Sequence, residues 1–292
     1  EVFCLSAEHE SFTAAAVSAG LTPAAVSRSV TRLEARLGVQ LFVRSTRRIR
    51  LTEAGRHYYQ QCRRALGGLI EAEHVITGGQ RQPSGTVRIS LPTGYGHYRV
   101  LPALPAFARL YPDIAIEIQL SNQNVDFTAS GCDLAVRARS LPDSGLTARK
   151  IEDAELTIVA APEYLRRHGT PTSVEALQQH ECIRFLLPSS GQPIPWLLRR
   201  KGRAIDVATH GALCCADDVL GPVTLARHGA GLAQAYRFSV ADDLRLGRLK
   251  EVLTEFGGTS RPFSLLHPAN RHFPLRVKVL KDFLLRELSS AP

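Results

Sequence analysis

The sequence predicts a small helical domain with a basic β-hairpin, then one long helix, then a larger α/β domain. Three observations support this order. Residues 11–51 contain two short helical patterns, a tight turn and an alternating hairpin. Residues 53–76 repeat apolar side chains at steps of three and four, and from residue 86 short apolar strands alternate with helical segments. We therefore expect an N-terminal domain at residues 1–58, a linker helix at 59–82 and an α/β domain at 83–292.

The N-terminal domain begins with the pattern of two helices joined by a tight turn. Ser11 or Thr13 can cap the first helix, and Gly20 can adopt the left-handed conformation that ends it. Thr22 is a good N-cap for the second helix, and Pro23 fits its first position because no hydrogen bond is lost there. These signals predict a helix-turn-helix.

The second helix, which should end at Gly38, has two contrasting faces. Apolar side chains at i, i+4, i+7 and i+11 share one face, and they are Val26, Val30, Leu33 and Leu37. The other face is short or basic, which suits a helix lying in the major groove of DNA. Arginine can bridge O6 and N7 of guanine, and serine or threonine can reach a phosphate or a base edge. The candidate DNA-binding residues of this helix are Pro23, Ala24, Ser27, Arg28, Thr31 and Arg32.

A basic hairpin is predicted at residues 41–51, where apolar residues alternate on either side of a Ser-Thr turn. Its arginines include Arg44, Arg47 and Arg48, which we take as further candidate DNA-binding residues. Such a segment can also be a solvated surface loop. Its position directly after a helix-turn-helix favours a wing that contacts the phosphates, which makes the domain a winged helix-turn-helix.

The net charge is concentrated in this domain. The whole chain carries +9, and residues 28–64 contain ten arginines against two glutamates, which gives +8 for that segment alone. A basic charge confined to one small domain indicates a polyanionic partner. We therefore expect double-stranded DNA as a partner.

An ordered series of residues now resembles the LysR-type transcriptional regulators. The series comprises residues 11–16, Leu21, 25–28, 33–34, 37–38, 41–42, Arg44 and 51–55, with looser matches at 124–126, 133–137 and 229–232. The resemblance covers essentially the whole chain. It implies a homo-oligomer, dimer or tetramer, that reads a pseudo-palindromic DNA site. It also implies an effector-binding domain of two periplasmic-binding-protein-like α/β subdomains, one at about 83–160 and 262–292 and the other at about 161–261.

The long helix should begin after Thr52, a potential cap. Its apolar stripe consists of Tyr58, Cys62, Ala65, Leu69, Ala72 and Ile76. The helix can be one more buried element of a monomer, or it can pair with a second copy because a small domain offers little core to cover it. The resemblance implies that this linker helix dimerises.

Alternating strands and helices predict mainly parallel sheets in the α/β domain. The expected strands are 87–91, 114–120, 134–137, 156–161, 182–187, 196–198, 232–235 and 263–267. The expected helices are 100–110, 125–130, 162–167, 217–228 and 275–288. By the resemblance, the chain crosses between subdomains near Ala160 and returns near Arg261.

A ligand site is expected where strand ends meet, because open α/β sheets bind ligands at the carboxyl ends of their strands. Hydroxyl, amide and guanidinium groups at these ends suit a small anion. Arg137 can instead serve in a structural ion pair, Thr93 can be only an N-cap, and Tyr95 and Tyr236 can be cleft walls. The candidate effector-binding residues are Thr93, Gly94, Tyr95, Asn122, Asn124, Arg137, Arg139, Asp217 and Tyr236.

Enzymatic, metal and cofactor roles lack support in the sequence. The six cysteines form no CxxC pair, the ten histidines lack metal spacing, and no serine lies in a G-x-S-x-G motif. Gly229 and Gly231 form only half of a dinucleotide fingerprint, and they precede a strand. We therefore expect no catalytic residues, no metal and no cofactor other than a small-molecule effector.

The expected location is the cytoplasm. No apolar run approaches the ~20 residues of a membrane helix. Scattered cysteines without an export signal suggest reduced thiols, with buried packing as their main role and redox sensing as the alternative. The alternative to a ligand-responsive regulator is a solute-binding α/β protein with a basic appendage, and an export signal or convergent catalytic residues would favour it.

Overall fold

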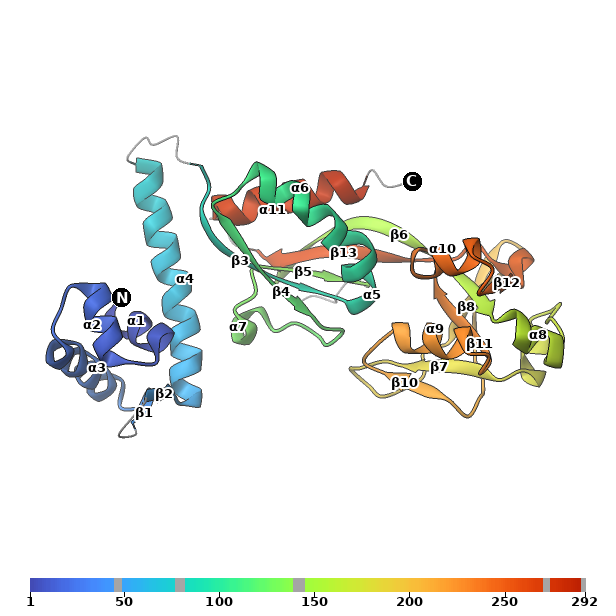
Figure 1. The fold of residues 1–292 in the computed structure, drawn as a ribbon, viewed down its shortest axis with the longest axis horizontal. Helices are drawn as coiled ribbons and strands as arrows, with labels where there is room; N and C mark the ends of the chain where they lie inside the picture. Colours follow the sequence, from blue (N-terminus) through green and yellow to red (C-terminus); the bar gives the residue numbers. More distant parts are fainter. Residues whose placement is uncertain (45–48, 77–81, 139–144, 270–273, 290–292) are drawn as a thin grey trace. The chain divides into compact units, whose positions relative to one another are not determined.

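The computed structural model describes residues 1–44, 49–76, 82–138, 145–269 and 274–289. The chain forms two compact units, each described by itself below (Figure 1). The first is built mainly on Glu1–Gln82, and it therefore includes the long helix. The second is built on Pro83–Val125, Cys132–Asn270 and Arg276–Pro292. No helix among the described residues is long and apolar enough to cross a membrane.

The first unit has the predicted helix-turn-helix and hairpin. Ser11 caps the second helix, since its hydroxyl accepts a hydrogen bond from the Ala14 N–H at 3.3 Å. Thr22 caps the third in the same way, with the Ala25 N–H at 3.2 Å. Gly20 ends the earlier helix at φ 64°. The elements are α1 (Val2–His9), α2 (Phe12–Ala19), α3 (Pro23–Leu37), β1 (Phe42–Arg44), β2 (Ile49–Leu51) and α4 (Glu53–Ile76).

The long helix α4 packs on the core of its own unit over its first three turns. Tyr58 and Cys62 contact the cluster that contains Phe3, Val30 and Leu41. Part of the apolar stripe therefore completes the core of the small domain, although both side chains stay partly exposed. Pairing of the stripe with a second chain remains a prediction. Further along the helix, Leu69 is 61% exposed.

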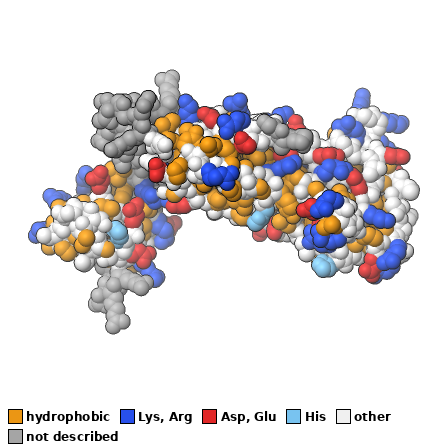
Figure 2. Space-filling model, turned by 45° about the horizontal axis from the view of Figure 1, so that its top comes forward, with side chains coloured by type: hydrophobic (Ala, Val, Ile, Leu, Met, Phe, Trp, Pro, Cys, Tyr) orange, Lys and Arg blue, Asp and Glu red, His pale blue; other side chains and the backbone are white. Residues whose placement is uncertain are grey.

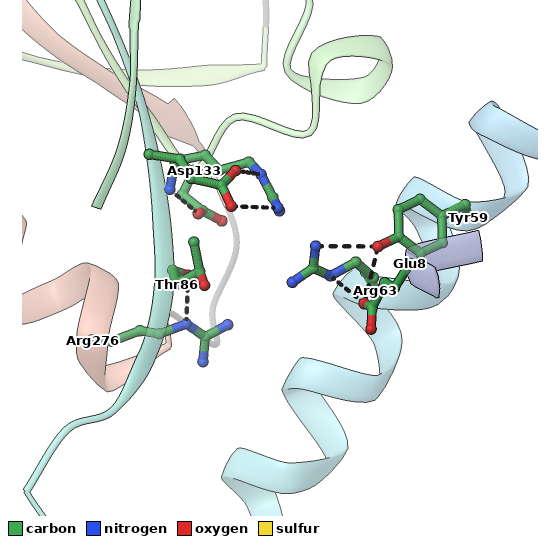
Figure 3. A network of polar contacts seen from close by, with 8 residues as sticks. Glu8, Tyr59, Arg63, Thr86, Asp133 and Arg276 are labelled. Atoms are coloured by element: carbon green, nitrogen blue, oxygen red, sulfur yellow. Dashed lines mark hydrogen bonds and ion pairs between the residues drawn. The ribbon is translucent and has the colours of Figure 1, made fainter. Parts of the chain in front are cut away.

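Two contacts fix α4 in place. Gly55 passes so close to the hairpin that a Cβ atom there would lie 2.0 Å from the carbonyl oxygen of Leu41, so only glycine fits. The Tyr59 hydroxyl donates to the Glu8 carboxylate of α1 at 3.0 Å and accepts from the Arg63 guanidinium at 3.2 Å (Figure 3). Burial and the hydrogen bond to Glu8 raise the pKa of Tyr59 to about 12.

The second unit consists of two α/β subdomains joined by two long antiparallel strands. These are β6 (Leu146–Ala160) and β13 (Ser260–Pro268), which pair from Glu155 opposite Ser260 to Leu146 opposite Pro268. β6 continues past β13 to pair with β11 and β12 of subdomain II, and the chain returns to subdomain I at the start of β13, so we call these two the crossover strands. Their pairing gives the strand order β10-β7-β11-β6-β13-β5-β3-β4 (Figure 1).

Subdomain I lies around one half of this strand order. Its strand β3 pairs in parallel with both β4 and β5, and β5 pairs antiparallel with β13. Val87 and Ile89 of β3 are fully buried, and the rings of Phe107 and Phe283 meet at 5.2 Å under the helices. The elements are β3 (Gly85–Leu91), α5 (Thr93–Tyr95), η1 (Gly96–Val100), α6 (Leu101–Leu110), β4 (Ile114–Leu120), β5 (Leu134–Arg137) and α11 (Leu275–Ser289).

Subdomain II has a sheet covered on both faces, which is typical of parallel strands. One face packs on a cluster around Tyr164, Leu177 and Trp196, and the other packs on Val223 and Val240. The strands are β7 (Cys182–Leu186), β8 (Trp196–Arg200), β9 (Arg203–Val207), β10 (Cys214–Ala216), β11 (Leu232–Tyr236) and β12 (Lys250–Val252). The helices are α8 (Pro162–His168), η2 (Glu175–Gln179), α9 (Leu220–Arg227), α10 (Arg237–Arg245) and η3 (Thr254–Phe256).

Several expected boundaries were wrong. The strand expected at 156–161 begins ten residues earlier, because the first half of β6 is polar on its exposed face. The helix expected to begin at Asp217 begins at Leu220, since Asp217 is left-handed at φ 62° and the Asp218 carboxylate accepts from the Leu220 N–H at 3.0 Å. Helix α10, which the sequence analysis did not place, is short and polar on average.

Candidate functional site

The face of α3 that was predicted to bind DNA is exposed in the structure. Val26 and Val30 are buried, while most of the candidate residues are exposed and Ser27 is half-buried. Within the described residues, Arg28 and Arg32 form no ion pair, so their guanidinium groups remain available. The exposed candidates are Pro23, Ala24, Arg28, Thr31 and Arg32.

The hairpin is attached to α3 by Glu34. Its carboxylate accepts the N–H groups of Leu41 at 2.8 Å and Phe42 at 3.0 Å. Phe42 then pairs with Leu51 across the antiparallel hairpin. Arg44 lies in β1, and the predicted contacts at Arg47 and Arg48 lie outside the described residues. The acidic residue of the helix thus positions the basic hairpin.

A cavity of about 370 Å³ lies between the two subdomains of the second unit, beside the crossover strands. Its size falls in the range of small-molecule sites, and most of its lining is apolar. The expected residues that line it are Gly94, Tyr95, Asn122, Asn124, Arg137 and Tyr236. Thr93 and Asp217 are not among its lining residues, and Arg139 lies outside the described residues.

Arg137 is buried at the end of β5, 8% exposed. Its Nη1 donates to the carbonyl oxygens of Ser90 and Val136, and its Nη2 donates to the Ser90 hydroxyl and the Gln123 carbonyl. Its Nε also donates to Gln123, at 3.2 Å. All five N–H groups therefore have acceptors in the protein. The side chain braces the cavity wall.

The charge of Arg137 is nevertheless uncompensated. No carboxylate forms an ion pair with it in the described part of the chain, and burial lowers the pKa of its guanidinium to about 10. It therefore stays cationic at neutral pH. A buried cation held only by neutral acceptors makes the cavity electropositive.

Thr93 and Asn122 form a polar cluster at the rim. The Asn122 carboxamide oxygen accepts the Thr93 N–H at 3.2 Å, and its amide donates to the Thr93 hydroxyl and to the Asp217 carbonyl oxygen. Thr93 and Asn122 belong to subdomain I and Asp217 to subdomain II, so the cluster spans the cleft. Thr93 and Asp217 thus close the cleft rather than line its cavity.

An aromatic cluster beside the cavity is centred on Phe263 of the crossover strand β13. The ring of Tyr95 stacks on Phe263 of β13 with centroids 4.1 Å apart, and Tyr236 meets Phe263 at 5.2 Å. The Tyr95 hydroxyl donates to Glu152 at 3.1 Å, and burial together with this carboxylate raises the pKa of Tyr95 well above its usual value. Arg99 pairs with the same carboxylate at 2.9 Å. These bonds attach subdomain I firmly to β6.

Several lining residues were missed by the sequence analysis. Arg261 of β13 and Gln234 of β11 add polar groups, and Trp196 adds an aromatic ring that is otherwise buried in the core of subdomain II. The turn-rich segment 188–195 had suggested only a connection between strands. The apolar residues in and around this segment were the signal that could have indicated a cavity wall. The apolar lining residues that were missed include Leu156, Ile183, Phe185, Leu187, Pro188, Ile194, Pro195 and Trp196.

Comparisons with known proteins match both units to one family. Residues 1–56 match the family described as bacterial regulatory helix-turn-helix protein, lysR family, and residues 80–289 match the LysR substrate binding domain. The HTH-type transcriptional regulator CrgA of Neisseria meningitidis serogroup C is 33% identical, over 99% of this chain and 96% of its own length. The HTH-type transcriptional regulator PtxR of Pseudomonas aeruginosa is also 33% identical, over 99% of this chain and 92% of its own length.

Solved structures give the same result. The structure of CrgA from Neisseria meningitidis is similar with a TM-score of 0.63 at 32% identity, covering 99% of this chain and 97% of that one. The full-length structure of the Vibrio cholerae virulence activator AphB is similar with a TM-score of 0.62 at 30% identity, covering 98% of this chain and 97% of that one. The architecture of helix-turn-helix unit, long helix and two-subdomain α/β domain is therefore shared along the whole chain.

Proposed function

Because the chain belongs to the LysR family of transcriptional regulators, and is thus a regulator rather than an enzyme, we propose that it binds promoter DNA as a homo-oligomer and responds to a small molecule in the cleft of its second unit. It acts in the cytoplasm, where its DNA lies. The observation that carries the proposal is the cavity between two subdomains that share crossover strands.

DNA recognition is assigned to α3 and the hairpin. Arg28 lies on the exposed face, opposite the buried Val26 and Val30. A helix with this division of faces can enter the major groove while its apolar face stays on the core. Arg44, Arg47 and Arg48 then contact phosphates beside the groove. These contacts are independent of sequence and sensitive to salt.

Self-association is assigned to apolar surface that remains exposed in both units. Leu69 of α4 provides it in the first unit. On the second unit, Figure 2 shows hydrophobic side chains gathered over α6 and α11, and Leu110 at the end of α6 is 58% exposed. Ile118 of the edge strand β4 is also exposed. Exposed apolar patches of this kind favour contact with further copies of the chain. The oligomer is a dimer or a tetramer.

The response follows from differential binding. A ligand that contacts both subdomains stabilises one closure of the cleft relative to the others. The hydrogen bond at the rim, from the Asn122 amide to the Asp217 carbonyl oxygen, forms or breaks with that closure. In an oligomer, the closure biases how the DNA-binding units are presented, which couples the ligand to DNA.

The test uses the full-length chain and a DNA fragment that this chain selects by binding from a pool of random sequences. Fragment binding and protection from nuclease are measured with and without a panel of small organic acids. A regulator of the proposed kind changes its affinity or its protected length with at least one acid. A solute-binding protein with a basic appendage, the second candidate, binds the acid without either change.

A further inference from the structure

Building on the proposed effector cleft, we infer that its ligand is an amphipathic monoanion whose carboxylate binds Arg261 and whose apolar body lies against Trp196. This assigns the anion to the second crossover strand rather than to Arg137. Both residues line the same cavity. The difference between them is the state of their hydrogen-bond donors.

Arg261 is placed by the pairing of the crossover strands. It lies opposite Ala154 of β6, two positions before Phe263 on the same face of β13. Its Nη2 has one long hydrogen bond, 3.3 Å to the carbonyl oxygen of Pro195. Within the described residues it forms no ion pair, and it is half-buried. Its planar fork can therefore receive a carboxylate through two parallel N–H groups.

Arg137 cannot do this without losing existing bonds. Each of its five N–H groups already donates to Ser90, Gln123 or its own strand. A ligand that captured the fork would leave buried carbonyl oxygens unpaired. Arg137 instead contributes a fixed positive charge. Arg137 and Arg261 are the cations among the described lining residues, and together they favour an anion. Of these two, Arg261 is the one whose N–H groups are mostly without an acceptor in the described chain.

The body of the ligand is set by the rest of the lining. Most of the wall is apolar or aromatic, including Phe185, Leu187, Ile194, Trp196, Tyr236 and Phe263. A second charged or strongly hydrated group placed against these side chains would lose its water without a partner. The wall therefore selects a single anionic head on an apolar or aromatic body.

Trp196 is held in position before any ligand binds. Gln234 of β11 forms two hydrogen bonds with the next residue, Leu197, accepting its N–H at 3.0 Å and donating to its carbonyl at 2.9 Å. The Thr259 hydroxyl donates to the same carbonyl at 2.8 Å. The polar groups of Gln234 are thus committed to fixing the wall. Preorganisation of this kind favours a flat apolar surface on the ligand.

The cavity contains its own reporter, because Trp196 is the single tryptophan of the chain. The full-length protein is titrated with 3-phenylpropionate while the tryptophan fluorescence is followed. The neutral amide 3-phenylpropionamide tests the charge, and the hydrophilic dianion succinate tests the apolar body. We expect saturable change with 3-phenylpropionate, and at least about tenfold weaker binding of the other two.

Arg261→Gln removes the charge and keeps a polar side chain of similar reach. It should weaken 3-phenylpropionate at least about tenfold and leave the binding of the amide unchanged. Arg203→Gln on the exposed strand β9 is the matched control, and it should bind like the parent. Both variants lose one positive charge, so a difference in affinity between them reports the contact at Arg261 and not the overall charge of the protein.

Three results would overturn the inference. They are unchanged 3-phenylpropionate affinity in Arg261→Gln, tighter binding of succinate than of 3-phenylpropionate, and no saturable change with 3-phenylpropionate at millimolar concentration. The proposed function fails separately. If 3-phenylpropionate binds through Arg261 but DNA binding does not respond, the inferred ligand class is supported and the proposed coupling between ligand and DNA is wrong. If DNA binding responds to succinate while Arg261→Gln has no effect, the coupling stands and the inference falls.

Discussion

The side-chain amide of Asn122 donates a hydrogen bond to the backbone carbonyl oxygen of Asp217, and this bond joins the two subdomains across the cleft. The neighbouring Gln123 amide donates to the Asp217 carboxylate at 2.7 Å. Gly94 approaches the same place, where a Cβ atom would lie 3.0 Å from a methyl of Val219. The rim of the cleft is therefore closed by polar groups over an apolar cavity.

Opening of the cleft should follow from a charge placed at this rim. Asn122→Asp turns a donor into a carboxylate facing the carbonyl oxygen and carboxylate of Asp217, and like charges repel. We expect faster amide hydrogen exchange at residues 93–96 and 217–221 than in the parent protein. Gln178→Glu on the exposed side of η2 adds the same charge outside the rim and is the control. Equal exchange in both variants would show that the rim contact does not hold the cleft.

Base recognition should depend on Arg28. Arg28→Ala removes an exposed guanidinium of α3, so specific binding should weaken by about 1–3 kcal/mol and selectivity should relax at one base step. Arg47→Ala or Arg48→Ala should instead weaken binding to all sequences and flatten its salt dependence. Gel-shift titrations on selected and scrambled fragments measure both effects. Unchanged specific affinity in Arg28→Ala would mean that α3 does not read bases.

Self-association should depend on Leu69, which is exposed on α4. Leu69→Arg places a charge in an apolar contact and should release smaller species in sedimentation velocity. Cys62 lies on the same helix but packs on the core, so Cys62→Arg should destabilise the first unit instead. A parent protein that sediments as a monomer, or a Leu69→Arg variant that keeps the parent's mass, would contradict this assignment.

Stability of the second unit should depend on Arg137. Arg137→Lys cannot supply five N–H groups, so buried acceptors at Ser90 and Gln123 lose partners, each at about 1–3 kcal/mol. The melting temperature of the second unit should fall while nonspecific DNA binding by the first stays the same. Differential scanning calorimetry with a DNA titration checks this. A fully stable Arg137→Lys variant that no longer binds acids would return Arg137 to the role of ligand contact.

Local signals made the first unit predictable. Ser11, Gly20, Thr22 and Pro23 act within one turn of the chain, and each has the predicted role in the structure. The attachment of the hairpin by Glu34 was not predictable, because it depends on two N–H groups seven and eight residues away. The same holds for Tyr58 and Cys62, whose apolar character is compatible with either a core or an interface.

The cavity was predicted in position more than in chemistry. Tyr95, Asn122 and Arg137, taken from strand ends, line the cavity, and their role as ligand contacts remains a prediction. Sequence could not show that the donors of Arg137 all have protein acceptors, since those acceptors are mostly backbone carbonyls. The apolar wall was missed because Trp196 and its neighbours follow a turn-rich segment that periodicity describes poorly.

Coupling between the cleft and DNA is tested most directly by one paired titration. Full-length protein is titrated with 3-phenylpropionate at several concentrations of the selected DNA fragment, while Trp196 fluorescence and DNA binding are read in the same samples. Reciprocity requires that DNA change the affinity for the acid by the same factor as the acid changes the affinity for DNA. We expect one shared factor different from one. Saturation of the Trp196 signal with unchanged DNA affinity and an unchanged protected length would contradict a ligand-responsive regulator.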